Sequence, residues 1–332
     1  MIIKDAILHI MDFASDVCVF SEQQLDLSEN GTGEFIEKHL SRLIDDSAAK
    51  EGNFSDYSIF KQTLKKYAGG SMDFTSLSAA AGNLLYDQLS RADEPERIDV
   101  LFSRFSEEGA EYIALIVFPN KTAYTHRVEK TGEGTANKLV RYLTVLPAAT
   151  QKLSCYALIR LDDWKIRFCD RKRLINGEEI YVLPDRVLQC AYGQSDRDVV
   201  KIIRKAAGET AEEFGANSAV AVTRAKSRMI ENAEQNVPFT PDELSNEVFA
   251  ENEVMKEAFA EKIREAGMPA EISVENPKVV KSMRSHKLKT DTGIEIKIPT
   301  EYLQDNRYVE FINNPDGTIS IALKHIGKIV NR

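Results

Sequence analysis

The sequence has few of the residues that build a disulfide scaffold or a thiolate metal site. Only four cysteines occur in 332 residues, and they are scattered at Cys18, Cys155, Cys169 and Cys190 without a CxxC pair. The five histidines show no spacing typical of metal ligands. Isolated cysteines on apolar strands are usually buried, inert thiols, so we expect neither disulfides nor a bound metal.

Long apolar stretches are also missing. The longest run, Tyr112 to Phe118, has seven residues, whereas a membrane helix needs about 20. The N-terminus carries an acid at Asp5 and no small-residue cleavage site, which is typical of a strand and not of a signal peptide. We therefore expect a cytoplasmic protein that makes no contact with a membrane.

Motifs that mark common enzymes are absent: there is no Walker A loop, HExxH, GxSxG or EF-hand loop. The glycine-rich stretch Gly132–Lys138 lacks the spacing and the Ser/Thr of a phosphate-binding loop, and we predict a flexible loop that leads into a helix. One pattern resembles a nuclease, because Asp291 precedes Glu295-x-Lys297, and such acids can hold magnesium. Acid-x-Lys is common in charged strands, so we keep the nuclease as an alternative and predict no enzyme, no catalytic residue and no cofactor.

The composition is that of an ordinary globular protein, with 43% hydrophobic and 29% charged residues, and the length suggests about two domains. Strand-like and helix-like patterns come in blocks along the chain. Blocks of this kind predict the α+β class, with an antiparallel sheet packed against helices, a helical middle segment and a small β-rich C-terminal part. We place the N-terminal domain at residues 1–193, the helical segment at 194–270 and the small C-terminal domain at 271–332.

Periodicity predicts the individual elements. We expect strands at 2–11, 17–20, 98–105, 112–117, 123–128, 153–161, 165–169 and 179–183, with an antiparallel meander over 98–128. We expect helices at 35–49, 57–67, 71–89 (capped by Ser71), 195–215, 218–235 (capped by Ser218) and 244–263. A linker is expected over 267–277, and a β-hairpin with a five-residue loop over 308–323. The apolar stripes of the two helices in 195–235 suit either a core or a dimer interface.

The net charge of −9, from 43 bases and 52 acids, argues against a protein that coats nucleic acid with its whole surface. The charge is unevenly distributed: residues 1–56 and 231–275 are acidic, whereas 152–205 and 276–332 each have a net charge of +4. The densest basic segment has five bases in twelve residues and no acid, at Lys278, Lys281, Arg284, Lys287 and Lys289. Such a segment could contact several phosphates, or it could be a solvated surface beside the acidic helices.

A second basic group lies partly within the predicted strand 165–169 and partly just after it. On a strand, Lys165 and Arg167 share one face while Ile166 and Phe168 share the other. This alternation predicts an apolar inner face and a cationic outer face, although a half-buried strand without a ligand has the same pattern. The group comprises Lys165, Arg167, Arg171, Lys172 and Arg173.

The chain also resembles a known family. The opening Ile7-Leu8-His9, the helix Phe35–Ala49, the apolar segment Leu153–Trp164 with its Leu-Asp-Asp-Trp end, and the hairpin Tyr308–Leu323 are similar in order and spacing to the bacterial 37 kDa nucleoid-associated proteins. The sequence Val187–Gly193 departs from the family pattern, as in a divergent member. The resemblance implies association with the bacterial nucleoid in the cytoplasm, and it supplies no site residues.

Together these observations predict a non-catalytic nucleoid-associated protein that binds DNA with low sequence specificity. Binding would be direct, through the two basic groups, or indirect, through a DNA-bound nucleoid protein. A homodimer is possible. The alternatives are the metal-dependent nuclease and a protein–protein adaptor without nucleic-acid contact, which the acidic net charge favours.

Overall fold

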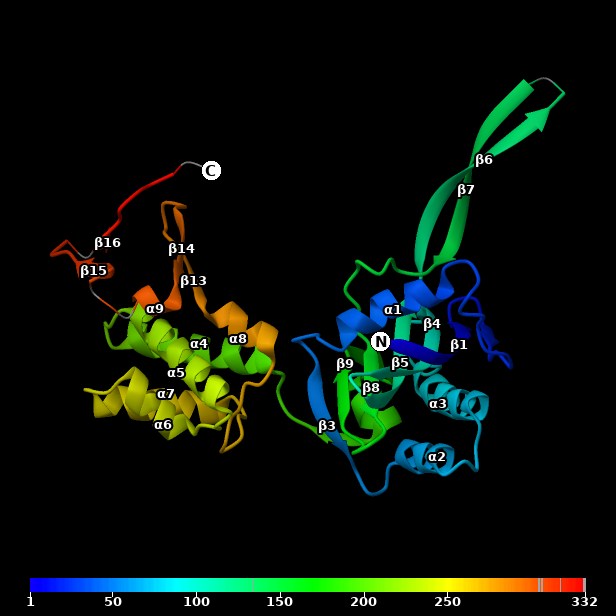
Figure 1. Ribbon diagram of the computed structural model, residues 1–332, viewed down its shortest axis with the longest axis horizontal. Helices are drawn as coiled ribbons and strands as arrows, with labels where there is room; N and C mark the ends of the chain where they lie inside the picture. Colours follow the sequence, from blue (N-terminus) through cyan, green and yellow to red (C-terminus); the bar gives the residue numbers. More distant parts are fainter. Residues whose placement is uncertain (133, 304, 306, 317, 331–332) are drawn as a thin grey trace. The chain divides into compact units, whose positions relative to one another are not determined.

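The computed structural model describes residues 1–132, 134–303, 305, 307–316 and 318–330. The chain forms two compact units, Met1–Gly193 and Gln194–Arg332 (Figure 1). The first contains a large antiparallel sheet with helices, and the second is mainly helical with small hairpins. This arrangement confirms the predicted α+β class. The division into an N-terminal domain, a helical segment and a small C-terminal domain stays a prediction.

An eight-stranded antiparallel sheet organises the first unit, in the order β12-β3-β9-β8-β5-β4-β1-β2. Its central strands are buried over consecutive residues, as in Ile98–Phe102 of β4 and Ile113–Phe118 of β5, because both faces of the sheet are covered. The strands are β1 (Ile2–Asp12), β2 (Val17–Val19), β3 (Lys50–Phe54), β4 (Arg97–Glu107), β5 (Ala110–Pro119), β8 (Tyr156–Arg160), β9 (Ile166–Cys169) and β12 (Cys190–Tyr192). The sequence patterns missed only the short strands β3 and β12 of this sheet.

Helices cover the two faces of the sheet. The helix α1 (Thr32–Leu43) packs on one face, and α2 (Ile59–Ala68), α3 (Phe74–Leu89) and the π-helical turn η1 (Leu183–Leu188) pack on the other. The cap of α3 differs from the prediction. Asp73, and not Ser71, is the N-cap, because its Oδ1 accepts a hydrogen bond of 2.7 Å from the N–H of Ser76.

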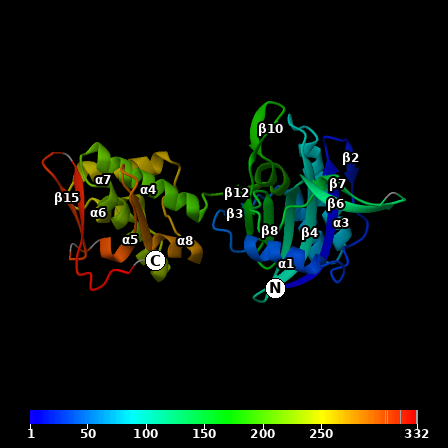
Figure 2. The same cartoon turned by 90° about the horizontal axis from the view of Figure 1, so that it is seen from above.

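Two further hairpins lie outside the sheet. One is β6 (Lys121–Thr131) with β7 (Gly134–Val145), which extends away from the first unit in Figures 1 and 2; the other is β10 (Lys172–Ile175) with β11 (Glu178–Tyr181). The predicted meander is therefore wrong after β5, since among the described residues β6 pairs with β7 and with no strand of the sheet. The loop and helix predicted from Gly132 are also wrong, because the β-branched and aromatic residues of 139–145 favour a strand.

The second unit packs its helices around one core. They are α4 (Asp196–Glu213), α5 (Ser218–Gln235), α6 (Pro241–Val248), α7 (Glu253–Glu265), α8 (Pro277–Met283) and α9 (Thr300–Leu303). The single helix predicted over 244–263 is two helices, because Asn252 begins α7 by accepting a hydrogen bond of 3.1 Å from the N–H of Met255. Asn217, and not Ser218, is the N-cap of α5.

The apolar stripes of α4 and α5 pack into this core. Val199, Ile203, Ala206 and Met229 are all buried in it, so the stripes do not remain available for a dimer interface. The predicted linker is packed as well. Ile272 forms a β-bridge with Phe239 through two backbone hydrogen bonds of 2.9 Å.

The C-terminal part contributes two hairpins, β13 (Ser285–Lys289) with β14 (Glu295–Pro299) and β15 (Val309–Asn313) with β16 (Ile319–Leu323). The predicted terminal hairpin is confirmed by the pairing of Val309 with Leu323. Its predicted loop includes Gly317, which lies outside the described residues.

Candidate nucleic-acid interface

The hairpin β13–β14 has one buried face and one cationic face. His286, Leu288 and Ile298 point inward and are buried or half-buried. On the other face, Lys287 lies directly opposite Lys297 in the strand register, and both are exposed. Like charges placed opposite each other across two strands repel and destabilise the pair. An anion bound between them would relieve this repulsion.

The short helix α8 places further lysines beside the chain entering this hairpin. Asn276 caps the helix by accepting hydrogen bonds from the N–H groups of Lys278 and Val279, at 3.0 and 3.3 Å. Val279 and Met283 are buried in the core of the second unit. The opposite side of α8 therefore faces solvent. Lys278 and Lys281 are exposed there.

Acids pair with Arg284 and Lys289 of this segment. Arg284 forms an ion pair with Glu234 of α5, and Lys289 lies 3.6 Å from Glu295 across the hairpin. Lys281 and Lys287 have no acidic partner within the described part of the chain. We define the C-terminal cationic surface as Lys278, Lys281, Lys287 and Lys297. Sequence reasoning treated Lys297 as a nuclease residue and missed it as a surface cation, although the alternation in 294–298 places it on the outward face of the strand.

The bases of the second group at 171–173 are paired with acids, Arg171 and Lys172 on the surface and Arg173 in the interior. Arg173 is only 5% exposed, and its guanidinium contacts Glu96 at 2.8 Å and Asp170 at 2.9 Å. Arg171 also pairs with Glu96, at 2.7 Å, and Lys172 pairs with Glu179 at 3.0 Å. The structure therefore does not support Arg173 as a DNA contact, since burial keeps its guanidinium from solvent.

The predicted cationic outer face of β9 is wrong. Arg167 lies opposite Leu158 of β8, on the sheet face that α1 covers. Its guanidinium donates hydrogen bonds to the carbonyl oxygens of Ile44 and Asp46, at 2.5 and 3.3 Å, just after the end of α1. Of Lys165 and Arg167, Lys165 is exposed and Arg167 is half-buried. The alternation of the sequence was correct, but it could not show that a helix lies on the second face.

A buried polar cluster holds β13 on α5. The Nδ1 of His286 lies 3.2 Å from the hydroxyl of Thr223, and Lys226 Nζ donates to the carbonyl of Ser285 at 3.2 Å. Burial and the nearby cations Lys226 and Arg204 lower the pKa of His286 to about 4. Burial and Arg204 lower the pKa of Lys226 to about 8. The cluster fixes the cationic hairpin to the helical core.

The residues of the nuclease alternative do not form a metal cage. Asp291 is exposed in the turn after β13, where its Oδ1 accepts a hydrogen bond of 2.9 Å from the N–H of Thr292. Glu295 faces Lys289 on the solvent side of the hairpin. Across the described residues, no group of three or more His, Cys, Asp or Glu side chains is placed to hold a metal ion.

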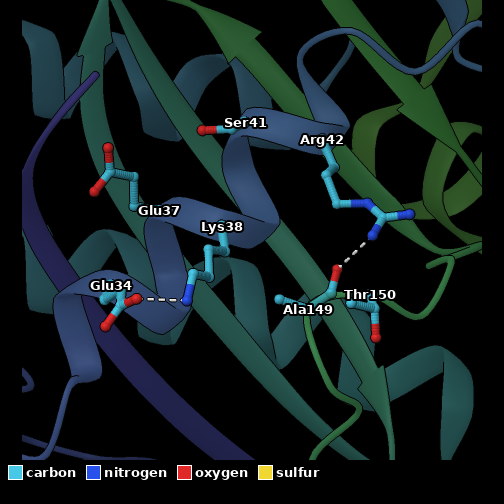
Figure 3. Close-up of a pocket in the computed structure, with 7 residues that line it drawn as sticks. All are labelled: Glu34, Glu37, Lys38, Ser41, Arg42, Ala149 and Thr150. Carbon is cyan, nitrogen blue, oxygen red and sulfur yellow. Dashed lines mark hydrogen bonds and ion pairs between the residues drawn. The ribbon is translucent and has the colours of Figure 1, made fainter.

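A surface pocket of the first unit lies between α1 and the chain that follows β7 (Figure 3). Its charged groups are engaged with neighbours: Lys38 pairs with Glu34, and Arg42 Nη1 donates to the carbonyl of Ala149 at 2.9 Å. These groups stabilise the wall of the pocket and do not form a converging set of catalytic side chains.

The fold and the surface define an α+β protein of two units that presents cations on exposed hairpins. No helix in the described part of the chain is long and apolar enough to cross a membrane. A family model described as "Nucleoid-associated protein YejK" matches residues 7–330. The chain belongs to this nucleoid-associated protein family, which confirms the resemblance seen in the sequence. No curated protein matches the chain.

Proposed function

We propose that this chain is a non-catalytic protein of the bacterial nucleoid, in the cytoplasm, that binds duplex DNA directly and with low sequence specificity. The observation that carries the proposal is the pair Lys287 and Lys297, placed opposite each other on an exposed hairpin face. Membership in a nucleoid-associated family supports a polyanion, and DNA in particular, as the anion that this pair accommodates.

Low specificity follows from the residues available. The C-terminal cationic surface consists of lysines, which contact phosphates as point charges. Lysine lacks the planar guanidinium of arginine, whose rigid set of donors can make two parallel hydrogen bonds. Phosphate contacts position a protein on DNA without reading its sequence. The acidic residues of 231–275 would be repelled by DNA and would orient the protein with its cationic surface toward the duplex.

The proposal is tested by fluorescence anisotropy of labelled duplex DNA across salt concentrations. Each phosphate contact contributes about −0.9 to the log–log slope of affinity against salt. The triple variant Lys281→Gln, Lys287→Gln and Lys297→Gln should make that slope shallower by about 2 to 3. A matched control with the same loss of charge replaces the exposed Lys65, Lys66 and Lys201 by Gln, and its slope should equal that of the unaltered protein.

Absence of binding by the unaltered protein at low salt would contradict the proposal. The link to the nucleoid would then be indirect, through a DNA-bound protein that docks on the acidic faces. A homodimer stays a separate prediction, which sedimentation of the purified protein tests directly.

A further inference from the structure

The β6–β7 hairpin is a long ribbon that belongs to neither hydrophobic face of the sheet. Both strands are exposed along nearly all of their described residues, and Figures 1 and 2 show the ribbon standing away from the first unit. An isolated two-stranded hairpin gains little stability in water because it has no core to bury. A ribbon of this length that supports no core has a surface suited to a partner.

The strand register gives the ribbon two different faces. The pairs Tyr124–Arg141, His126–Leu139 and Val128–Asn137 place three large apolar side chains on the same face. Of these, Leu139 is 79% exposed and Tyr124 65% exposed. Lys130 lies on this face near the tip, and Arg141 lies on it near the base. The face therefore has an apolar centre with a cation toward each end.

The ribbon is cationic in a chain that is acidic overall. Residues 121–145 contain five bases and two acids, a net charge of +3, whereas the whole chain has −9. Lys138 is paired with Glu129 at 2.6 Å. Arg127, Lys130 and Arg141 are exposed, and the described residues offer them no acidic partner.

We propose that the β6–β7 ribbon is a DNA-binding arm that lies in the major groove of duplex DNA. This inference rests on the proposed function, and it names a site on a different unit from the C-terminal cationic surface. The major groove is wide enough to admit a two-stranded β-ribbon. Eleven strand residues span roughly 35 Å, which matches one turn of B-DNA at about 34 Å.

The side chains of the apolar face suit this groove. Leu139, Val128 and Tyr124 would contact base edges, including the methyl group of thymine. Lys130 and Arg141 would reach phosphates on the two sides of the groove. A second copy of the ribbon fits less well, because two surfaces with unpaired cations at the same positions repel each other.

The test uses the full-length protein and three variants. The first, Arg127→Gln, Lys130→Gln and Arg141→Gln, removes three cations. Since the phosphate contacts of Lys130 and Arg141 contribute about 0.9 each to the slope, the unaltered protein should lose about twelvefold more affinity than this variant between 50 and 200 mM salt. The charge-matched control at Lys65, Lys66 and Lys201 should behave like the unaltered protein.

The second variant, Leu139→Ser, should weaken binding to B-form DNA without changing the salt slope, because no phosphate contact is lost. It should leave binding to double-stranded RNA unchanged, since the deep and narrow major groove of A-form RNA does not admit side chains. The third variant replaces residues 126–139 by Asn-Gly and shortens the ribbon. Circular dichroism should show unaltered melting for all three, because the ribbon is outside both cores.

The outcomes separate the two proposals. If the unaltered protein binds DNA and the ribbon variants bind as the control does, the arm is refuted while the proposed function stands. If the unaltered protein does not bind DNA, both fail together. If the ribbon variants convert a dimer to a monomer without loss of DNA affinity, the ribbon binds a second copy of the chain and not DNA. The proposed DNA-binding arm is then also refuted.

Discussion

Arg173 lies among the bases that the sequence grouped for DNA contact, but burial gives it a different role. Its guanidinium is enclosed with Asp170 and Glu96, and the side chain of Asp170 is fully buried. Removing one partner of a buried ion pair leaves an uncompensated charge, which destabilises a protein by about 3–5 kcal/mol. We therefore predict that Arg173→Met lowers the free energy of unfolding by that amount and does not change DNA affinity.

Urea unfolding followed by the fluorescence of Trp164 measures this change, because Trp164 is the only tryptophan and packs against the core of the first unit. Lys172→Met is the matched control. Lys172 pairs with Glu179 on the surface, so its loss should leave the urea midpoint nearly unchanged. Equal midpoints for both variants would show that the Arg173 pair contributes no stability.

Lys226 gives a prediction with a defined pH dependence. Its side chain is 3% exposed, and burial lowers its pKa to about 8 from an ordinary 10.5. Between these two values the unfolded chain holds the proton that the folded chain has lost, so stability rises with pH across this window. Lys226→Met should remove this rise and should raise the free energy of unfolding at pH 7 by about 1–3 kcal/mol.

The measurement is urea unfolding at pH 7 and at pH 10, followed by circular dichroism. Lys201→Met, on the exposed side of α4, is the control and should keep the pH dependence of the unaltered protein. A Lys226→Met variant that is less stable at pH 7 would show that the hydrogen bond to Ser285 outweighs the burial of the charge.

At the scale of elements, caps decided where the helices begin. The helix α6 has a complete capping box, in which Thr240 accepts from the N–H of Glu243 at 3.1 Å and Glu243 accepts from the N–H of Thr240 at 2.8 Å. We predict that Thr240→Ala lowers the free energy of unfolding by about 1 kcal/mol. Thermal or urea unfolding followed at 222 nm tests this, and Thr240→Ser should restore the stability.

Elements were predictable where one pattern dominated over a long window. The stripes of α1, α4 and α5 and the apolar strands β4 and β5 each bury many residues, so their periods are strong. The short strands β3 and β10 were missed, because four or five residues carry too little pattern. The strand β7 was mistaken for a loop and a helix, since Gly132 and Gly134 suggested flexibility while the strand signal began only at Leu139.

At the scale of the whole molecule, the two units have separate hydrophobic cores. Phe259 is fully buried in the core of the second unit, and Phe→Ala changes at such positions lower stability by about 3–5 kcal/mol. Phe259→Ala should therefore shift the unfolding transition seen at 222 nm to lower urea. The transition seen by Trp164 fluorescence should stay in place, and a joint shift would show that the units unfold together.

The candidate site was only partly predictable at this scale. The local density of bases identified five side chains between Lys278 and Lys289 that the structure leaves exposed, and their contact with DNA stays a prediction. The alternation of 285–289 implied one outward face. The opposition of Lys287 and Lys297 was not visible, because strand register depends on pairing between segments. The ion pairs of Arg284 with Glu234 and of Lys289 with Glu295 were likewise not visible in the sequence.

The sequence by itself determined the α+β class, the main helices and central strands, the acidic and basic blocks, and the family to which the chain belongs. These follow from periodicity, propensity and local composition, which act between residues that are near in the chain. Only the tertiary structure decided that α1 covers the face of β9 that carries Arg167, that Arg173 is enclosed by acids, and that β6 and β7 form an exposed ribbon. Each depends on contacts between distant segments, where burial and pairing override the local pattern.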